Sequence, residues 1–131
     1  MTRKELLTNY RAAVIEVEEL RRQLARIGTD GRPAGVRTTD TSQIGRGTND
    51  PAAAALQLAD GLEEMLARKK AELEGMRQQV DALLRGIRDF RTYMVIQHYY
   101  ICAHTDEQVA RTMSMSKSRI NQIRTGFLRA G

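Results

Sequence analysis

The sequence has few of the residues that build compact or disulfide-linked domains. It contains no tryptophan and only two prolines, and aromatic residues make up 5% of its 131 residues. Few aromatic side chains and few helix breakers, together with abundant Leu, Ala, Glu, Arg and Gln, favour long helices over a compact globule. The single cysteine, Cys102, excludes an internal disulfide and is typical of a reducing cytoplasm.

Long apolar runs and common catalytic motifs are also missing. No apolar run is long enough to span a bilayer, and residues 1–5 do not start a secretory signal, so we expect a cytoplasmic protein with no membrane partner. The chain has no phosphate-binding loop and no Gly-x-Ser-x-Gly motif. We therefore expect that it is not an enzyme and needs no cofactor.

Positive charge is concentrated in the C-terminal third of the chain. The net charge is +5, and the part from Arg85 onward contains eight basic and three acidic residues. The first 84 residues contain 13 of each sign and are neutral. A polyanion partner is the natural inference for the C-terminal part, although a solubilising surface charge is the simpler alternative.

An apolar heptad pattern predicts a coiled-coil helix at the N-terminus. Its positions are Leu6, Tyr10, Ala13, Val17, Leu20, Leu24 and Ile27. Steps of three and four residues are typical of such a seam. Gly28 is expected to end this helix, because glycine is common just after a helix C-terminus. Residues 29–50 are rich in Gly, Thr, Arg and Asp and predict a long flexible loop.

A second seam predicts a longer helix that starts at Asp50-Pro51, a helix cap followed by proline. Its positions are Leu62, Leu66, Lys69, Leu73, Met76, Val80, Leu83, Ile87, Phe90 and Met94. Lys69 is the one polar interruption, either a register device or a side chain that reaches to solvent. Gly86 marks a possible hinge, and Asp89 is an alternative cap for a new helix.

These patterns predict an all-α protein, a long antiparallel helical hairpin with a C-terminal helix-turn-helix head. Its expected parts are a coiled-coil helix over 1–28, a flexible loop over 29–50, a long coiled-coil helix over 51–88 and the head over 89–131. Each seam can pair within the chain or with a second subunit, and the latter would make a homo-oligomer.

The last 27 residues carry the strongest functional signal. Thr105 and Gln108 have the spacing of a capping box, and Ser116 is placed to cap a second helix. Apolar residues at helical spacing predict the core of a helix-turn-helix. These core residues are Val109, Ala110, Met113, Ile120, Ile123 and Phe127. The second helix of such a unit usually enters the DNA major groove.

Two stretches of this region resemble region 4 of bacterial sigma factors. Residues 116–123, Ser-Lys-Ser-Arg-Ile-Asn-Gln-Ile, resemble its recognition helix, and residues 100–110 resemble its Tyr-Ile-x-Gly-x-Ser-x-x-Glu-Ile-Ala pattern. Ala103 and Ser114 stand where that family usually has glycine. The whole chain also resembles small phage and prophage proteins with such a C-terminus, several of which are late-gene transcriptional activators.

The resemblance implies roles for the polar residues of the second helix. It places Lys117, Ser118 and Gln122 at positions that contact DNA bases, and Arg119 and Asn121 near the DNA backbone. Lysine donates to guanine and glutamine pairs with adenine, which agrees with the base-contacting roles. Arginines neutralise phosphates. Those expected to do so are Arg111, Arg119 and Arg124.

His98, Cys102 and His104 form the one group that suggests a metal site. Structural zinc sites normally use four ligands, and the chain offers only these three soft ones. We therefore expect no metal, with Cys102 packed as a small hydrophobic residue.

The leading functional hypothesis is a sequence-specific regulator that binds double-stranded DNA and acts with RNA polymerase, as a phage or prophage late-gene activator. One alternative is a small terminase-type DNA-packaging protein, which also combines helix-turn-helix heads with helical oligomerisation segments. Another is a module that binds polymerase or a sigma factor without reading DNA.

Overall fold

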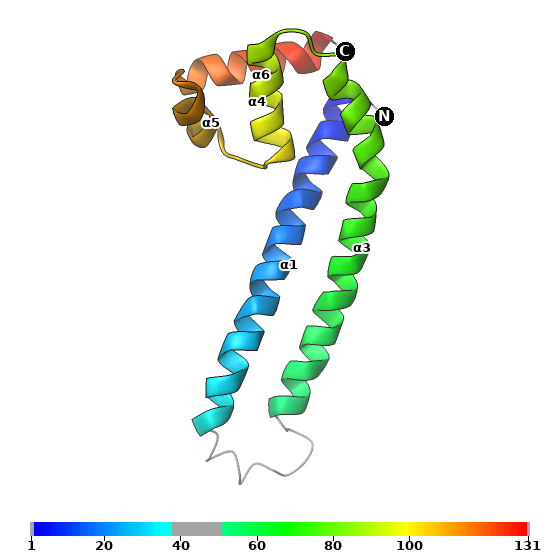
Figure 1. Ribbon diagram of the computed structural model, residues 1–131, viewed down its shortest axis with the longest axis vertical. Helices are drawn as coiled ribbons and strands as arrows, with labels where there is room; N and C mark the ends of the chain where they lie inside the picture. Colours follow the sequence, from blue (N-terminus) through cyan, green and yellow to red (C-terminus); the bar gives the residue numbers. More distant parts are fainter. Residues whose placement is uncertain (1, 38–50, 131) are drawn as a thin grey trace. The chain divides into compact units, whose positions relative to one another are not determined.

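The computed structural model describes residues 2–37 and 51–130, without the side chains of residues 28–37. Within these ranges every element is helical, as Figure 1 shows. The elements are α1 (Arg3–Arg37), α3 (Pro51–Arg85), α4 (Phe90–Ile96), the π-helical turn η3 (Gln97–Ile101), α5 (Asp106–Met113) and α6 (Lys117–Ala130). The expected all-α class is confirmed.

The chain divides into two compact units. Unit 1 contains Met1–Ile15 and Ala71–Gly131, and unit 2 contains Glu16–Lys70. Unit 1 therefore combines the start of α1, the end of α3 and the four C-terminal elements. Unit 2 combines the remainder of α1 with the first part of α3.

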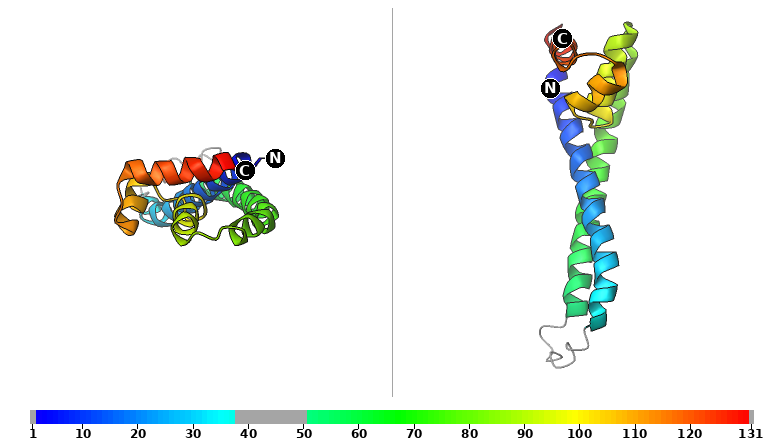
Figure 2. Two further views of the ribbon diagram at one scale, coloured as in Figure 1. Left: turned by 90° about the horizontal axis from the view of Figure 1, so that it is seen from above. Right: turned by 90° about the vertical axis from the view of Figure 1, so that its left-hand side faces the viewer.

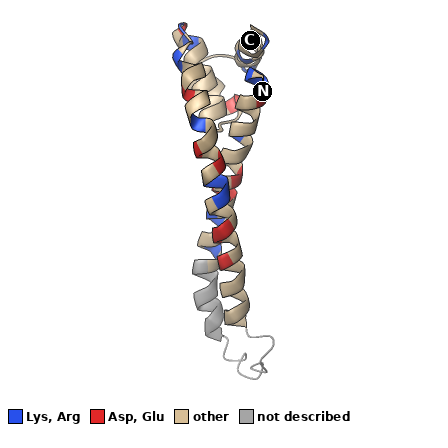
Figure 3. Ribbon diagram, turned by 90° about the vertical axis from the view of Figure 1, so that its right-hand side faces the viewer, with Lys and Arg blue, Asp and Glu red and all other residues tan. Residues whose placement is uncertain are grey.

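In unit 2, α1 and α3 bury part of the predicted apolar seams. Val17, Leu20 and Leu62 are buried. Lys69 of α3 pairs with Glu16 of α1 at 3.1 Å, so the polar interruption of the second seam has an acidic partner. Both side chains are partly exposed, and such a pair contributes at most about 1 kcal/mol to stability. Acidic and basic residues are interspersed along α1 and α3 (Figure 3).

Unit 1 contains a hydrophobic cluster, here named the stem cluster, that joins the start of α1 to the end of α3 and to the C-terminal elements. Its buried members are Leu6, Leu7, Tyr10, Val80, Leu84, Ile96 and Tyr100. The Tyr10 hydroxyl also accepts a hydrogen bond from Arg77 of α3 at 3.0 Å. The end of α6 lies beside the start of α1 in all the views of Figures 1 and 2. The start of α1 is therefore part of the C-terminal fold.

Two predicted helix boundaries are wrong. α1 continues past Gly28 to Arg37, so the expected loop over 29–50 does not begin at residue 29. A glycine inside a helix costs only about 1 kcal/mol relative to alanine, which is too little to end a helix by itself. Residues 38–50 lie outside the described part of the chain. The second helix ends at Arg85 rather than at residue 88.

The second seam breaks at the junction that follows α3. Phe90 was expected on the buried face, but it is 71% exposed because α3 has ended and α4 begins there. The Asp89 side chain caps α4 by accepting a hydrogen bond from the Thr92 amide at 2.9 Å. Asp89 is therefore a helix cap, one of the two alternatives that the sequence left open.

Candidate nucleic-acid interface

α5 begins at a capping box formed by Thr105 and Gln108. The Gln108 amide donates to the Thr105 hydroxyl at 3.1 Å, and the Thr105 amide donates to the Gln108 side-chain oxygen at 2.9 Å. These two bonds satisfy backbone donors that the first turn of a helix leaves free. The predicted capping box is confirmed.

The turn between α5 and α6 depends on Ser114. This residue ends α5 in the left-handed region, with φ 56° and ψ 46°. The Met115 amide then donates to the Ala110 carbonyl at 2.9 Å. Ser116 starts α6, because its hydroxyl accepts a hydrogen bond from the Arg119 amide at 3.1 Å. The chain therefore reverses within Ser114 to Ser116, and α6 begins directly afterwards.

A second hydrophobic cluster, here named the head cluster, holds α4, α5 and α6 together. Val95, Val109 and Ile120 are fully buried in it. The partly buried hydrophobic residues around them include Ala110, Met113 and Ile123. Five of the six predicted core residues therefore meet in this cluster.

Phe127 was expected in the same core but packs against the stem cluster instead. The Arg3 guanidinium lies 4.2 Å from the centroid of its ring and donates to its backbone carbonyl at 2.8 Å. The reason is that the start of α1 covers the end of α6, a contact between residues 124 positions apart. Helical spacing alone does not reveal this contact.

The predicted base-contacting residues lie on the exposed part of α6. Lys117, Ser118 and Gln122 are all exposed. Lys117 approaches Glu107 of α5 at 3.8 Å, with side chains 61% and 67% exposed. A pair this long and this exposed to solvent holds Lys117 only weakly. These three side chains are therefore free to meet a ligand.

Three of the four residues expected to contact the DNA backbone are exposed as well. These are Arg111 on α5 and Arg119 and Asn121 on α6. Together with Lys117, they place three cationic side chains on the exposed parts of the two helices. A surface of this kind attracts a polyanion.

Arg124 differs from the other arginines of this region. Its side chain is 13% exposed and forms two hydrogen bonds to the Asp106 carboxylate, at 3.0 and 3.2 Å. Its guanidinium also lies 4.0 Å from the centroid of the Tyr99 ring. The geometry gives Arg124 a role in fixing α6 to α5 and η3, and its charge is already paired with that of Asp106.

The contacts of Arg124 also affect the pKa values around it. Burial alone would lower the pKa of Arg124, but its interactions with Tyr100, with Tyr99 and with the Asp106 carboxylate outweigh burial and raise the pKa. Burial raises the pKa of Tyr100 above its ordinary value. Arg124 therefore stays a cation and Tyr100 stays neutral near pH 7.

His98, Cys102 and His104 are not gathered into a group of possible metal ligands. The two imidazole rings stack with centroids 5.6 Å apart and planes 12° apart, and Cys102 is exposed. Within residues 2–37 and 51–130, no cluster of three or more possible metal ligands is found. The expectation that Cys102 packs as a hydrophobic residue is wrong, because it follows η3 at the surface.

Sequence reasoning missed the residues that join α1 to the C-terminal elements. Arg11 of α1 donates to the carbonyls of Tyr99 at 3.0 Å and His104 at 3.2 Å. Its guanidinium also lies 4.2 Å from the centroid of the Tyr99 ring. Arg3 and Arg11 appeared only as charged positions beside an apolar seam, and no local pattern links them to residues so distant in the sequence.

No protein-family model matches this sequence, and neither the curated proteins nor the solved structures include a significant match to it.

Over the described residues, no helix has the length and apolar character needed to cross a membrane.

Proposed function

We propose that this protein is a sequence-specific regulator of transcription that binds double-stranded DNA through α5 and α6. One observation carries the proposal: the first half of α6 follows a tight turn and exposes its polar side chains, while Ile120 anchors it in the head cluster. A helix-turn-helix reads DNA with this part of its second helix. The segregation of all the net positive charge to residues 85–131 supports a polyanion partner.

Each exposed side chain has a role in this proposal. Lys117, Ser118 and Gln122 contact base edges in the major groove, where lysine suits guanine and glutamine suits adenine. Arg111, Arg119 and Asn121 contact phosphates and set the position of the head on the duplex. Arg124 holds α6 in place instead.

We further propose that α1 and α3 form an antiparallel coiled-coil hairpin that carries the head. In unit 1 the start of α1 contacts the end of α3, which is the arrangement that such a hairpin requires. This pairing uses the predicted seams within one chain. A homo-oligomer would then use other apolar residues, and Leu56, Leu58 and Met65 of α3 are exposed.

The biological role that best fits this architecture is a phage or prophage late-gene activator in the host cytoplasm. The resemblance of the α5–α6 region to sigma region 4 supports an action beside RNA polymerase at a promoter. In this mechanism the head binds a promoter-proximal site, and the helical stem positions a second head or contacts the polymerase.

The experiment that tests the proposal is selection of bound fragments from the source genome with the purified protein. Salt of about 150 mM suppresses weak binding that rests on phosphates alone. We expect enrichment of one short site upstream of a block of genes. Enrichment beside terminase genes, with a ring-shaped assembly, would instead indicate a packaging protein. No enrichment, with polymerase binding that survives loss of Lys117 and Gln122, would indicate a protein-interaction module.

Substitution of Gln122 tests the proposed readout directly. Gln122→Ala should weaken binding to the selected site by about 1–3 kcal/mol and relax the preference at one base pair. Gln79→Ala is the matched control, because Gln79 is also an exposed helical glutamine but lies on α3. An equal loss for all DNA sequences would make Gln122 a positioning residue and not a reader of bases.

A further inference from the structure

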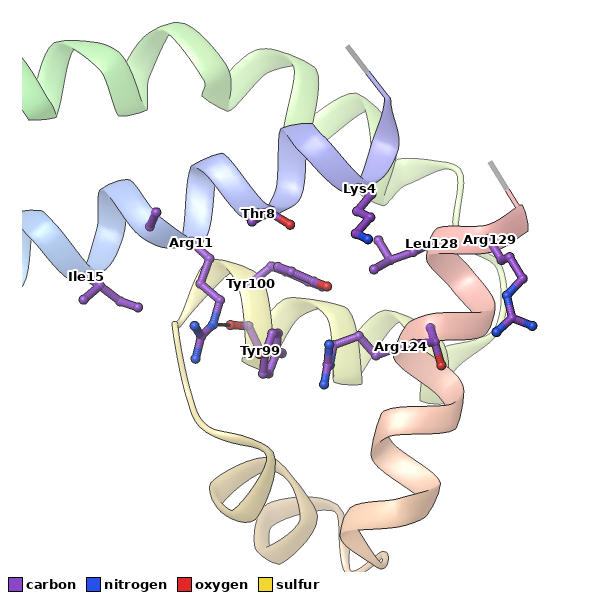
Figure 4. Close-up of a pocket in the computed structure, with 11 residues that line it drawn as sticks. Lys4, Thr8, Arg11, Ile15, Tyr99, Tyr100, Arg124, Leu128 and Arg129 are labelled. Carbon is purple, nitrogen blue, oxygen red and sulfur yellow. Dashed lines mark hydrogen bonds between the residues drawn. The ribbon is translucent and has the colours of Figure 1, made fainter.

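Unit 1 contains a cavity of about 580 Å³ between the start of α1, η3 and the second half of α6. This volume is within the range of about 300–1,000 Å³ that is usual for small-molecule sites. Figure 4 shows Lys4 of α1 pointing toward Leu128 of α6, and Arg11 of α1 pointing toward Tyr99 of η3. None of the sequence patterns indicates this cavity, because it joins segments far apart in the chain.

The charge of the cavity lining has one sign. Four of the eleven residues that line the cavity are cationic and none is acidic; the cationic residues are Lys4, Arg11, Arg124 and Arg129. Asp106 offsets the charge of Arg124. Arg11 donates only to neutral backbone carbonyls, so its charge is not compensated there. Across the described residues, Lys4 and Arg129 have no ion pair, and both are exposed.

The cavity combines fixed and adaptable cations. Two hydrogen bonds and the ring of Tyr99 hold the Arg11 guanidinium in place. A ligand that binds Arg11 therefore does not lose free energy to immobilising this side chain. Lys4 and Arg129 are exposed side chains that can reach a ligand at the mouth of the cavity. Positive charges that line a concave site concentrate anions, and three uncompensated charges spread along the lining favour a multivalent anion over a single carboxylate.

The aromatic residues of the cavity are not free to stack on a ligand. Arg11 and Arg124 lie on either side of the Tyr99 ring, at 4.2 and 4.0 Å from its centroid (Figure 4). Tyr100 is buried in the stem cluster, only 3% exposed. The cavity is therefore suited to bind the charged group of a ligand, and it offers no free aromatic ring on which a nucleobase could stack.

We propose that this cavity is a binding site for a phosphate-bearing anion. Arg11, held against Tyr99, forms the fixed part of the site, and Lys4 and Arg129 add positive charge from the start of α1 and the end of α6. The proposal does not require that α6 reads bases. Thr125 and Arg129 do lie on the same face of α6 as Ser118 and Gln122, because they follow at helical spacings of three and four. The phosphate can therefore belong to the DNA backbone or to a small free molecule, and both present the same chemistry.

The test is a calorimetric titration of the full-length chain with inorganic pyrophosphate in the absence of DNA, at about 150 mM salt. We expect saturable binding of one pyrophosphate per chain, with a Kd of about 1 mM or tighter. The double variant Lys4→Gln, Arg129→Gln should weaken binding at least about tenfold. The charge-matched control Arg68→Gln, Lys70→Gln lies on exposed positions of unit 2 and should change the Kd by less than about twofold.

Absence of saturable binding, or an equal loss in the two double variants, would overturn the proposal. Equal thermal unfolding of the cavity variant and the wild-type chain shows that a loss of binding is not a loss of folding. Because pyrophosphate is the probe, this result does not depend on whether α6 reads DNA. A melting temperature that rises with pyrophosphate in the wild type but not in the cavity variant would confirm the site independently.

A second titration, with the selected DNA, identifies the source of the phosphate. If the cavity variant also lowers the salt dependence of DNA binding, by about two phosphate contacts, the site takes a phosphate of the DNA backbone. If it loses pyrophosphate binding while the salt dependence is unchanged, the ligand is a small free phosphate compound. Both results support a phosphate site and assign its ligand.

Discussion

The two halves of α6 have different surroundings although they belong to one helix of 14 residues. In the first half, the polar residues from Lys117 to Gln122 are exposed and Ile120 alone is fully buried. In the second half, Arg124 is tied to Asp106, and Phe127 and Leu128 pack against the stem cluster. The helix is thus anchored along its second half and presents its first half to solvent. Substitutions in the two halves should therefore affect different measurements.

The largest expected effect is the loss of Arg124. Arg124→Ala removes both hydrogen bonds to Asp106 and the contact with Tyr99, and it leaves a partly buried carboxylate without its partner. We expect a loss of about 2–3 kcal/mol in the free energy of unfolding. The measurement is urea denaturation, with the exposed Arg119→Ala as the matched control from the first half. Equal stability of the two variants would contradict the view that α6 is anchored along its second half only.

A second prediction concerns the backbone on either side of α5. Ala103 and Ser114 both have φ 56°, and they are the two residues other than glycine in the described chain with positive φ. A side chain in the left-handed region costs about 1–2 kcal/mol that glycine does not pay. Ala103→Gly and Ser114→Gly should therefore each raise the free energy of unfolding by about 1 kcal/mol, measured by urea denaturation.

The control for these glycine variants is Ala82→Gly, at an exposed position inside α3. Glycine has no conformational advantage in a helix, so this variant should be less stable than the wild type by about 1 kcal/mol. A loss of stability in all three variants would mean that the two turns are not strained.

Local features of α5 and α6 could be predicted from the sequence because short-range contacts fix them. The capping box of Thr105, the Ser116 cap and the burial of Val109 and Ile120 each depend on residues within one or two turns of a helix. Ser114 stands where the sigma-like pattern has glycine, and the structure gives it a positive φ, a conformation that glycine adopts most easily. Ala103 also stands where that pattern has glycine, and it too has a positive φ. The glycine of the pattern was therefore a sequence signal for the backbone conformation of both residues.

Long-range features could not be predicted because nothing local encodes them. Arg3 and Arg11 look like solvated residues beside a seam, yet they bind backbone carbonyls 124, 88 and 93 residues away. Arg124 looks like a phosphate contact until Asp106 is found beside it. The end of α1 was misplaced for another reason: glycine only weakens a helix, and the rest of the helix decides whether it continues.

A third prediction concerns a single charge in the first half of α6. Arg119→Gln should leave the free energy of unfolding within about 0.5 kcal/mol of wild type, because Arg119 is exposed. It should reduce the slope of log affinity for DNA against log salt concentration by about 1, the loss of one phosphate contact. Arg68→Gln, in unit 2, is the control that keeps the slope. An unchanged slope for Arg119→Gln would remove it from the interface.

The smallest expected effect is the pH dependence at the cap of α4, close to the exposed half of α6. The Thr92 amide holds the pKa of Asp89 below its ordinary value of 3.8, with smaller contributions from the Thr92 hydroxyl, Arg91 and Arg119. Because the folded pKa is depressed, the stabilisation from Asp89 is complete above the ordinary pKa and is lost as the pH falls through the folded value. The melting temperature of the protein should therefore decrease as the pH is lowered below about 4.

Asp89→Asn separates this titration from that of the other carboxylates. Asparagine caps a helix about as well as aspartate but does not ionise. The variant should therefore melt close to wild type near pH 3. Between pH 3 and pH 6 its melting temperature should rise less than that of wild type, because it lacks the charge that the Thr92 amide and hydroxyl and, more weakly, Arg91 and Arg119 stabilise. Identical melting curves for the two proteins across that range would mean that Asp89 acts through its hydrogen bond alone.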